Sequence, residues 1–467
     1  MQTAIWWIRR DLRLADNPAL LAALEAARQV VPVFVVDEKL LRSPYNSPRR
    51  QAFLLHGLYR LDEDLRERGG RLIVRRGDPL IELANLLHES GAGGVFAEAD
   101  HSPYARQRDE RIAAELPLNL TTGVTVQPPG VVLKADGAAY TVFTPFSRAW
   151  QALPWPGAVR PAPERIKTPE HIDGIRLDAL VDWPEEERFP AGEAEGQRRL
   201  AAFAARRIDA YGEQRNRLDL EGTSALSPYL RFGMISARQA ASAAREALRK
   251  AEGSAARRSV ETWINELVWR EFYVHILHNF PRVRRTAFRH ELADIHWDND
   301  LEVFAAWQAG CTGYPVVDAG MRQLRELGWM HNRGRMITAS FLVKDLLIDW
   351  RWGERHFMQH LLDGDPAANN GGWQWTAGSG TDAAPYFRVF NPTLQGIKFD
   401  PHGDYVRRYV PELASVPAEF IHEPWKMPLD IQKQIGCVIG ADYSEPIVDH
   451  AAARLRALER YGQKLPH

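Results

Sequence analysis

Cysteine is nearly absent from this chain: only Cys311 and Cys437 occur among its 467 residues. Two thiols cannot form the disulfide framework of a small secreted domain or a cysteine-based metal centre. Apolar residues make up 45% of the chain and charged residues 25%, which is typical of a globular protein with a sizeable core. The sequence therefore predicts a globular protein that holds no metal.

Long apolar runs are also missing. No stretch approaches the roughly 18 uninterrupted apolar residues that a membrane-spanning helix requires. The amino-terminal segment MQTAIWWIRRDLR lacks the apolar core of a signal peptide. We therefore expect a cytoplasmic protein that has no membrane contact.

There is no excess of charge of either sign, because the net charge is −1 and the isoelectric point is about 7.0. Arginines are nevertheless clustered in residues 206–217 and 281–290. Such a cluster is either a solvated helix face or a local surface that binds a phosphate backbone. Composition alone leaves both interpretations open.

The glycine-rich turn of a dinucleotide-binding sheet is the fourth missing feature. Residues 1–130 alternate β-branched runs with amphipathic segments, which predicts a parallel sheet with helices on both faces. After the first run the chain reads RRDLR instead of G-x-G-x-x-G, so a dinucleotide-dependent enzyme is disfavoured. The crevice at the strand ends can still hold a ligand. The expected strands are 4–8, 30–36, 71–75, 94–97 and 124–126.

The rest of the chain divides into two parts. Residues 131–195 are rich in proline and glycine and are expected to form a long linker with little regular structure. Helical spacing prevails over 196–467, and Ser236 with Gln239 forms a capping box. The predicted architecture is an α/β domain (1–130) with a five-stranded parallel Rossmann-like sheet, a linker, and a larger all-α domain.

Tryptophan, in contrast, is abundant, with 15 residues. Two of them flank a glutamine in the sequence GGWQW at 371–375. Indoles stack on flat ligands and transfer electrons, but they also fill helical cores. Core filling is the default for a single tryptophan, whereas the whole group indicates stacking, electron transfer or both.

One predicted helix combines indoles with charges. Trp263, Glu266 and Arg270 fall on one face, and Trp269 lies beside them. A carboxylate between two indoles and a guanidinium is suited to a flat polar ligand. The ordinary alternative is an amphipathic helix with a Glu266–Arg270 ion pair.

Three further motifs carry polar groups close together. Residues 222–228 (GTSALSP) place hydroxyls at a helix start, which suits either phosphate binding or an ordinary cap. Residues 329–336 (WMHNRGRM) combine an amide with two arginines. Residues 363–370 (DGDPAANN) offer two acids and two amides, which suit either a cofactor's hydroxyls and ring nitrogens or a plain turn.

In this order the motifs resemble the DNA photolyase/cryptochrome family, in particular its bacterial class I members, which repair cyclobutane pyrimidine dimers (CPD). The resemblance runs from WIRRDLRL at 7–14 to HEPWK at 422–426, and includes the strings MITASFLVKDLLIDW and NNGGWQW. It implies light-driven repair, in which photoexcited, reduced, anionic FAD gives an electron to a flipped-out dimer. Because the electron returns after ring opening, the implied enzyme is a carbon–carbon lyase.

The resemblance also implies residue roles. The cofactor-binding set is Tyr211, Thr223, Ser224, Leu226, Ser227, Trp263, Arg270, Arg335, Asp363, Asp365 and Asn369. The set that contacts the dimer or the DNA backbone is Arg215, Glu266, Trp269, Asn332, Arg333, Met336, Trp375 and Lys398. The catalytic set is Glu266, which would stabilise the dimer's radical anion, Asn369 beside flavin N5, and the electron-transfer chain Trp373, Trp350 and Trp297.

A second, light-harvesting chromophore is implied in the α/β domain. Phe34, Asp37, Arg50 and Asp100 match contacts of deazaflavin- or flavin-binding members. Residues 97–104 depart from the pattern of folate-binding members, so a deazaflavin or FMN is expected rather than folate.

The same fold with FAD also serves signalling, so a cryptochrome-type blue-light photoreceptor is the alternative function. A non-catalytic DNA-binding module is a weaker alternative, because it would not need the tryptophan chain. We expect a monomer that acts on UV-damaged DNA containing pyrimidine dimers and needs no obligate protein partner.

Overall fold

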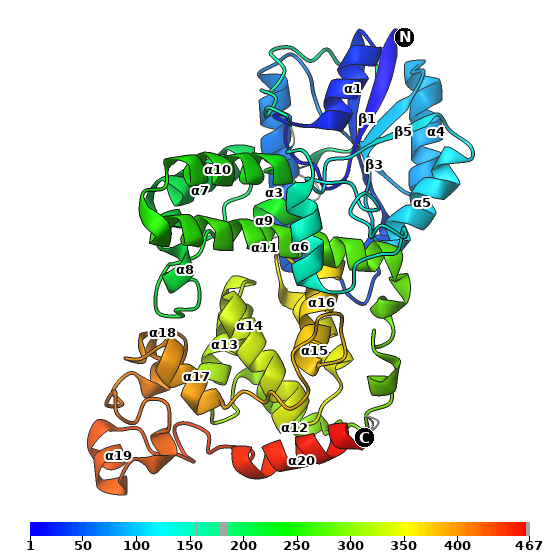
Figure 1. Cartoon of the computed structure of the whole chain (residues 1–467). Helices are drawn as coiled ribbons and strands as arrows, with labels where there is room; N and C mark the ends of the chain where they lie inside the picture. The colour runs from blue at the N-terminus through cyan, green and yellow to red at the C-terminus, as the bar shows by residue number, and fades with distance from the viewer. Residues whose placement is uncertain (156, 178–184, 186, 464–467) are drawn as a thin grey trace. The chain divides into compact units, whose positions relative to one another are not determined.

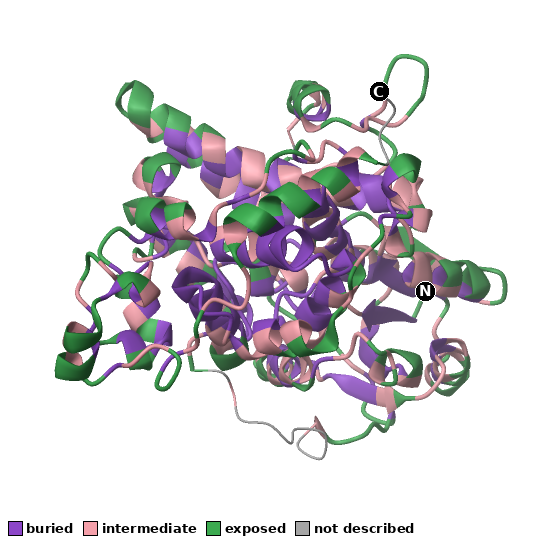
Figure 2. Ribbon diagram, turned by 90° about the horizontal axis from the view of Figure 1, so that it is seen from below, coloured by how far each residue is buried: buried purple, intermediate pink, exposed green. Residues whose placement is uncertain are grey.

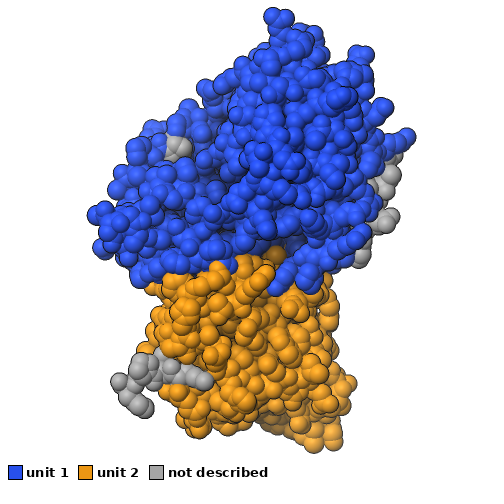
Figure 3. Space-filling view, turned by 90° about the vertical axis from the view of Figure 1, so that its right-hand side faces the viewer, with its two compact units in different colours: residues 1–212, 223–281, 362–367 blue, residues 213–222, 282–361, 368–467 orange. Residues whose placement is uncertain are grey.

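The computed structural model describes residues 1–155, 157–177, 185 and 187–463. The chain divides into two units, coloured separately in Figure 3. Unit 1 comprises residues 1–212, 223–281 and 362–367, and unit 2 comprises residues 213–222, 282–361 and 368–467. No helix among the described residues is long and apolar enough to cross a membrane.

Unit 1 begins with a five-stranded parallel sheet in the order β3-β2-β1-β4-β5 (Figure 1). Its strands contain buried apolar runs such as QVVPVFVV in β2, as is typical of parallel strands covered on both faces. The predicted sheet is thereby confirmed. The strands are β1 Thr3–Ile8, β2 Gln29–Val36, β3 Ile73–Arg76, β4 Val95–Glu98 and β5 Leu118–Thr121.

The fifth strand lies earlier than predicted. β5 pairs with β4 from Leu118, whereas residues 124–126 form no strand. Side chains of helix α11 (Gly253–Asn279) bind that segment instead: Arg270 donates to the Val124 carbonyl at 2.8 Å, and the Glu271 carboxylate accepts the Val126 N–H. Because its backbone groups are satisfied in this way, the β-branched sequence VTV does not join the sheet.

Four helices beside the sheet begin with a polar cap followed by proline. In each, the cap side chain accepts a backbone N–H of the first turn, and proline, which lacks an N–H, occupies the first helical position. The sequence thus sets these boundaries locally. They are α1 Pro18–Ala26, α3 Pro48–Arg66, α4 Pro79–Ser90 and α5 Pro103–Ala113, and the short helix α2 Glu38–Leu41 follows β2.

The helical part of unit 1 is built around α11 (Gly253–Asn279). Helix α10 (Ala237–Lys250) packs on it through a buried stripe of alanines and begins at the Ser236–Gln239 capping box, which confirms that prediction. Helix α6 (Phe143–Ala152) also packs on α11, although it lies in the segment predicted as irregular. Phe146 and Trp150 form the buried face of α6. The prolines around this segment are the reason that the sequence predicted no helix here. The other elements are α7 Glu193–Arg206, η2 Ile208–Ala210, α8 Tyr211–Gln214, which continues into unit 2, and α9 Ser227–Arg231.

Unit 2 is helical, and its hydrophobic core cluster contains Trp307, Trp350 and Trp373. Figure 2 shows the burial of each residue along the ribbon. Helix α14 (Asn332–Ser340) passes directly into a π-helix, η5 Phe341–Asp345, inside the string MITASFLVKDLLIDW. The helices are α12 Leu301–Ala309, α13 Pro315–Leu327, α14 Asn332–Ser340, α15 Trp350–His360, α16 Pro366–Ala377, α17 Pro392–Phe399, α18 Asp404–Tyr409, α19 Leu429–Ile435 and α20 His450–Gly462. The short 3-10 turns are η3 Pro281–Arg284, η4 His290–Leu292, η6 Pro411–Leu413 and η7 Pro424–Lys426.

The π-helix of unit 2 buries a lysine. Lys344 is 1% exposed, and its Nζ lies 3.3 Å from the ring centroid of Tyr461 and 3.3 Å from the Tyr386 carbonyl oxygen. No carboxylate among the described residues forms an ion pair with it. Burial lowers the pKa of Lys344 to about 7.

The approach of α9–α10 to the loop after β1 depends on a glycine. Gly233 has a φ of +62°, and a Cβ there would lie 2.0 Å from the Arg10 carbonyl oxygen. We expect Gly233→Ala to lower the free energy of unfolding by more than about 2 kcal/mol, because clash adds to backbone strain. Gly91→Ala is the control: its φ is +61°, but a Cβ there would meet nothing within 4 Å, so only about 1 kcal/mol of strain is expected. Equal losses in urea unfolding would contradict the proposed close packing.

The buried lysine makes stability depend on pH. The unfolded chain binds a proton at Lys344 up to a pKa of about 10.4, whereas the native pKa is about 7, so unfolding takes up a proton between these values. The free energy of unfolding should therefore rise with pH through this window, by roughly 2–4 kcal/mol in total. Lys344→Met should remove this rise, and Lys250→Met, whose side chain is 69% exposed, should keep it. An unchanged pH slope in Lys344→Met, measured by urea unfolding, would show that Lys344 is not the group responsible.

Candidate functional site

Helix α11 brings two predicted cofactor residues into one aromatic cluster in unit 1. Trp263 is 3% exposed and packs against Phe203 at 5.1 Å between ring centroids. Tyr211 meets the same Phe203 ring edge-on at 5.8 Å. Phe203 therefore links two residues that lie far apart in the sequence, and no sequence motif marked it.

The predicted stacking residue Trp269 already has a stacking partner. Its indole lies parallel to the Phe143 ring, with 3.7 Å between centroids and 4° between planes. Phe272 packs edge-on at 5.6 Å. These contacts fix the plane of the half-buried indole, which is what a stacking platform for a base requires. Phe143 was not predicted.

The hydroxyl-rich loop 222–227 does not cap helix α9 in the ordinary way. The N-cap position is Leu226, and no side chain makes a capping hydrogen bond there. Ala225 has a φ of +49°, a strained conformation for a residue with a side chain. Thr223 and Ser224 are half-buried and Ser227 is exposed. Strain of this kind is common where a loop is shaped for a ligand.

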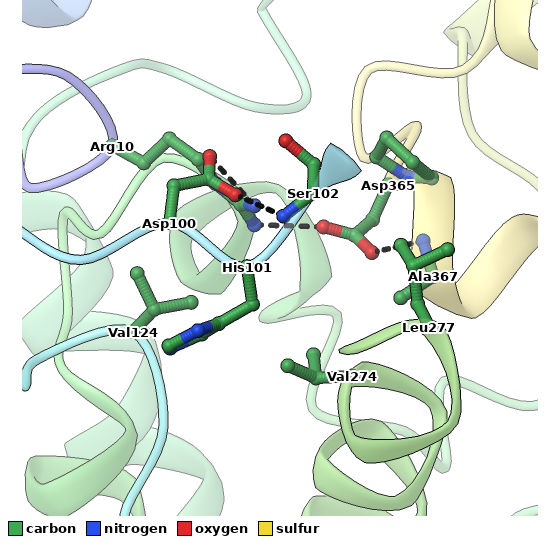
Figure 4. Close-up of a pocket in the computed structure, with 10 residues that line it drawn as sticks. Arg10, Asp100, His101, Ser102, Val124, Val274, Leu277, Asp365 and Ala367 are labelled. Carbon is green, nitrogen blue, oxygen red and sulfur yellow. Dashed lines mark hydrogen bonds and ion pairs between the residues drawn. The ribbon is translucent and has the colours of Figure 1, made fainter. Parts of the chain in front are cut away.

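The loop before α16, with Asp363 and Asp365, is held by arginines of unit 1. Arg10 donates to Asp365 at 2.7 Å and lies 3.5 Å from Asp100, as Figure 4 shows. Arg231 Nε donates to the Gly364 carbonyl at 2.8 Å. Burial lowers the pKa of Arg50 to about 10, opposed by the carboxylates of Asp363 and Asp365. These acids therefore form a buried ionic network rather than a solvated turn.

A small cavity of about 10 Å³, the size of one water molecule, adjoins this network. His101, Val124, Val274 and Leu277 line it together with Arg10, Asp100 and Asp365 (Figure 4). Burial alone would raise the pKa of Asp100, but Arg10 and the Ser102 N–H hold that pKa below its ordinary range. The carboxylate thus stays charged inside the protein.

The four predicted antenna residues do not share their contacts. Arg50 and Asp100 belong to the ionic network around Asp365. Asp37 caps α2 and accepts a hydrogen bond from the Tyr104 hydroxyl, while Phe34 pairs with Ile8 in the sheet. The structure thus places one pair near the predicted flavin loop and the other pair at the end of β2.

In unit 2, Asn369 is oriented by α15. Its Nδ2 donates to the Glu354 carbonyl at 3.0 Å, so the amide has one defined orientation with Oδ1 available to accept. Trp373, one turn further along α16, is 2% exposed, and its buried indole N–H has no partner among the described residues. An unpartnered indole N–H and an oriented amide on one helix fit a polar ring system better than a purely apolar core.

The three predicted electron-transfer tryptophans belong to unit 2. Trp373 and Trp350 lie in its core cluster, and the half-buried Trp297 packs against that cluster and lies 6.2 Å from Tyr461. Gly353 allows Trp373 to fit, since a Cβ there would lie 2.1 Å from the indole. Trp307, which was not predicted, meets Trp373 edge-on at 6.2 Å. It is the one buried residue of the short helix α12, and no sequence motif distinguished it.

The predicted DNA residues of unit 2 include a cationic group around Phe399. Arg333 lies over this ring at 4.4 Å and Lys398 at 5.5 Å. Burial, with the nearby charges of Arg215 and Arg388, lowers the pKa of Arg333 to about 10. Arg388 is exposed and was not predicted. Such like charges repel each other and favour a phosphate-bearing partner.

The remaining predicted residues of unit 2 occupy α14 and α16. Exposed Asn332 reaches Met336 one turn along α14, with 3.8 Å from Nδ2 to Sδ. Trp375 is half-buried and packs against the core cluster. Arg335 Nε donates to the Met330 carbonyl at 2.8 Å.

The described residues contain no group of three or more His, Cys, Asp or Glu side chains that suits a metal ion.

Comparison with known proteins gives two family matches that together cover most of the chain. Residues 4–167 match the family model described as DNA photolyase, and residues 263–463 match the FAD binding domain of DNA photolyase. A deoxyribodipyrimidine photo-lyase from Synechococcus sp. is 40% identical over 98% of this chain and 96% of its own.

Two solved structures resemble the fold over nearly the whole chain. The crystal structure of a class III photolyase from Agrobacterium tumefaciens has a TM-score of 0.93 at 38% identity, covering 99% of this chain and 98% of that one. An archaeal photolyase from Sulfolobus tokodaii, solved with two FAD molecules, has a TM-score of 0.84 at 31% identity, covering 99% and 100%.

Proposed function

The chain belongs to the DNA photolyase family, and from this premise we propose that it repairs cyclobutane pyrimidine dimers in DNA with light as the energy source. The observation that carries the proposal is the 40% identity to a deoxyribodipyrimidine photo-lyase over 98% of the chain. The reaction class is a carbon–carbon lyase, because the transferred electron returns and no net redox change remains.

The residues present fit FAD. In unit 1, Tyr211 and the strained hydroxyl loop at Thr223–Ser227 would hold the phosphate side. Trp263 and Arg270 would line the flavin pocket, and the Asp363–Asp365 loop would contact the ring. In unit 2, the predicted cofactor contacts are Arg335 and Asn369, and the unpartnered indole N–H of Trp373 lies on the same helix as Asn369. Reduced, anionic FAD, when bound, supplies the excited electron.

The substrate residues would bind and orient a flipped-out dimer. Trp269, held flat by Phe143, and Trp375 offer indole faces to the pyrimidines. Glu266 and Asn332 offer hydrogen bonds to their polar edges, and Met336, next to Asn332, offers an apolar surface. Glu266 would also stabilise the charge that develops on the dimer. Arg215, Arg333 and Lys398 would hold the DNA backbone.

Electron supply from the surface is a separate role. Trp373, Trp350 and Trp297 would restore the reduced cofactor by successive short transfers, since all three belong to or pack against one core cluster. Asn369, with its Nδ2 tied to Glu354, would present Oδ1 to flavin N5. That geometry favours repair over a cryptochrome-type photoreceptor, which remains the alternative function.

The finer assignments are proposals as well. We assign the chain to class I, with class III as the alternative because the Agrobacterium structure belongs to it.

The proposed domains are an α/β domain (1–130), a linker (131–195) and a catalytic domain (196–467). The α/β domain would hold a deazaflavin or FMN antenna through Phe34, Asp37, Arg50 and Asp100. The identity of any chromophore released from purified protein tests the antenna assignment. We also propose a cytoplasmic monomer.

The test of the repair proposal is illumination of purified, reduced protein with a dimer-containing oligonucleotide. Dimers should disappear only in light. Glu266→Ala should lower the number of dimers repaired per absorbed photon several-fold, because the dimer loses the hydrogen bond that Glu266 offers, while FAD content stays unchanged and DNA is still bound. Glu261→Ala, an exposed acid on the same helix, is the matched control. An unchanged yield in Glu266→Ala would remove Glu266 from the mechanism, and no loss of dimers in light would favour the photoreceptor.

The tryptophan chain is tested by Trp373→Phe. This variant should lose light-driven reduction of oxidised flavin, because phenylalanine is much harder to oxidise than indole, yet should still repair dimers once reduced chemically. Absorbance during illumination with an external reductant measures the first property. Trp329→Phe, at a position that is also buried in unit 2 but is not part of the electron-transfer chain, should behave like the wild type. Normal photoreduction in Trp373→Phe would show that electrons take another path.

A further inference from the structure

Arg231, the last residue of helix α9, has a buried nitrogen without a partner. Its side chain is 16% exposed, and its Nη1 forms no hydrogen bond among the described residues. Its Nε donates to the Gly364 carbonyl at 2.8 Å and lies 3.9 Å from Asp365. Nε is therefore anchored while Nη1 lacks an acceptor.

The nearest carboxylates are already engaged. Asp365 accepts from Arg10 through one oxygen and from the Ala367 N–H through the other. Asp100 accepts from Arg10 and from the Ser102 N–H. Arg10 also donates to the carbonyl of Arg231 itself at 3.2 Å, which brings a second guanidinium close to the first.

Burial and the charge of Arg10 lower the pKa of Arg231 to about 9, so the group is still a cation at neutral pH. A buried cationic donor without an acceptor is costly, and an anionic oxygen is the acceptor that offsets both the charge and the missing hydrogen bond. A single water molecule would supply the hydrogen bond but no charge, and the carboxylate of Asp365, 3.9 Å from Nε, is shared with Arg10.

Two neighbouring segments indicate which anion would bind Arg231. Arg231 ends the short helix that starts at Ser227, in the predicted phosphate-side loop. Its Nε is bonded to Gly364, between the two predicted ring-side aspartates. Arg231 is thus tied to both halves of the predicted cofactor set, although the resemblance assigned it no role.

We propose that Arg231 is a further FAD-binding residue whose Nη1 donates to an anionic oxygen of the cofactor, with Arg10 as the residue that positions it. The oxygen belongs either to the pyrophosphate or to the anionic reduced ring, and both offer the same chemistry to a guanidinium. The inference rests on the proposed function, because it requires FAD in this site.

The test is titration of flavin-free protein with FAD and with riboflavin, which lacks phosphate. Arg231→Gln should weaken FAD binding about ten-fold or more, as expected for a lost charge-assisted hydrogen bond, and Arg231→Lys should weaken it less. Arg199→Lys is the matched control: that arginine also lies partly buried in unit 1, but it binds Glu195 and the Arg188 carbonyl. Thermal unfolding of each flavin-free variant separates binding from stability.

The outcomes are distinct. Weaker FAD binding with unchanged riboflavin binding assigns the oxygen to the pyrophosphate. Weaker binding of both, with a lower midpoint potential of the bound flavin, assigns it to the ring. Unchanged FAD affinity, a loss no larger than in Arg199→Lys, or a loss only of thermal stability overturns the inference. A wild-type protein that does not bind FAD would instead refute the proposed function.

Discussion

One buried arginine connects the sheet of unit 1 to the loop that carries the predicted flavin contacts. Arg10 follows β1 and holds Asp365, which lies 355 positions further along the chain, at 2.7 Å, and it also lies 3.5 Å from Asp100 at the end of β4. All three side chains are about 15% exposed or less. Buried charges of this kind are stable only while each keeps its partners, so the three loops constrain one another. The position of Arg231, and of Gly233 against the Arg10 backbone, follows from this bridge.

Unit 2 depends on close packing of large rings. Trp373 fits because Gly353 has no side chain, and it is surrounded by Phe357 at 4.9 Å and Trp307 at 6.2 Å. Rigid packing matters for both proposed roles of this unit, since electron transfer and base stacking depend on fixed distances between aromatic planes. The helix that carries Trp373 also carries Asn369 and Trp375, so a few turns of backbone position all three.

Local signals predicted much of the fold. The buried β-branched runs marked β1 to β4, and polar-cap and proline pairs mark the starts of four helices. The errors arose where a tertiary partner replaced a local one. Residues 124–126 have strand-like composition, but Arg270 and Glu271 bind their backbone. Helix α6 was hidden by its proline-rich surroundings, because the burial of Phe146 and Trp150 against α11 stabilises it.

The sequence by itself determined the family, the parallel sheet, the helical remainder and the residue types of the candidate site, because periodicity, capping and long motif strings are local properties of a chain. Only the tertiary structure decided which of those residues share a partner. It placed Arg50 and Asp100 in the ionic network around Asp365, stacked Phe143 on Trp269, and left Arg231 with an unpartnered nitrogen. These relations join positions more than a hundred residues apart, and burial makes their charges and ring contacts strong. Neither the distance nor the burial can be read from local sequence.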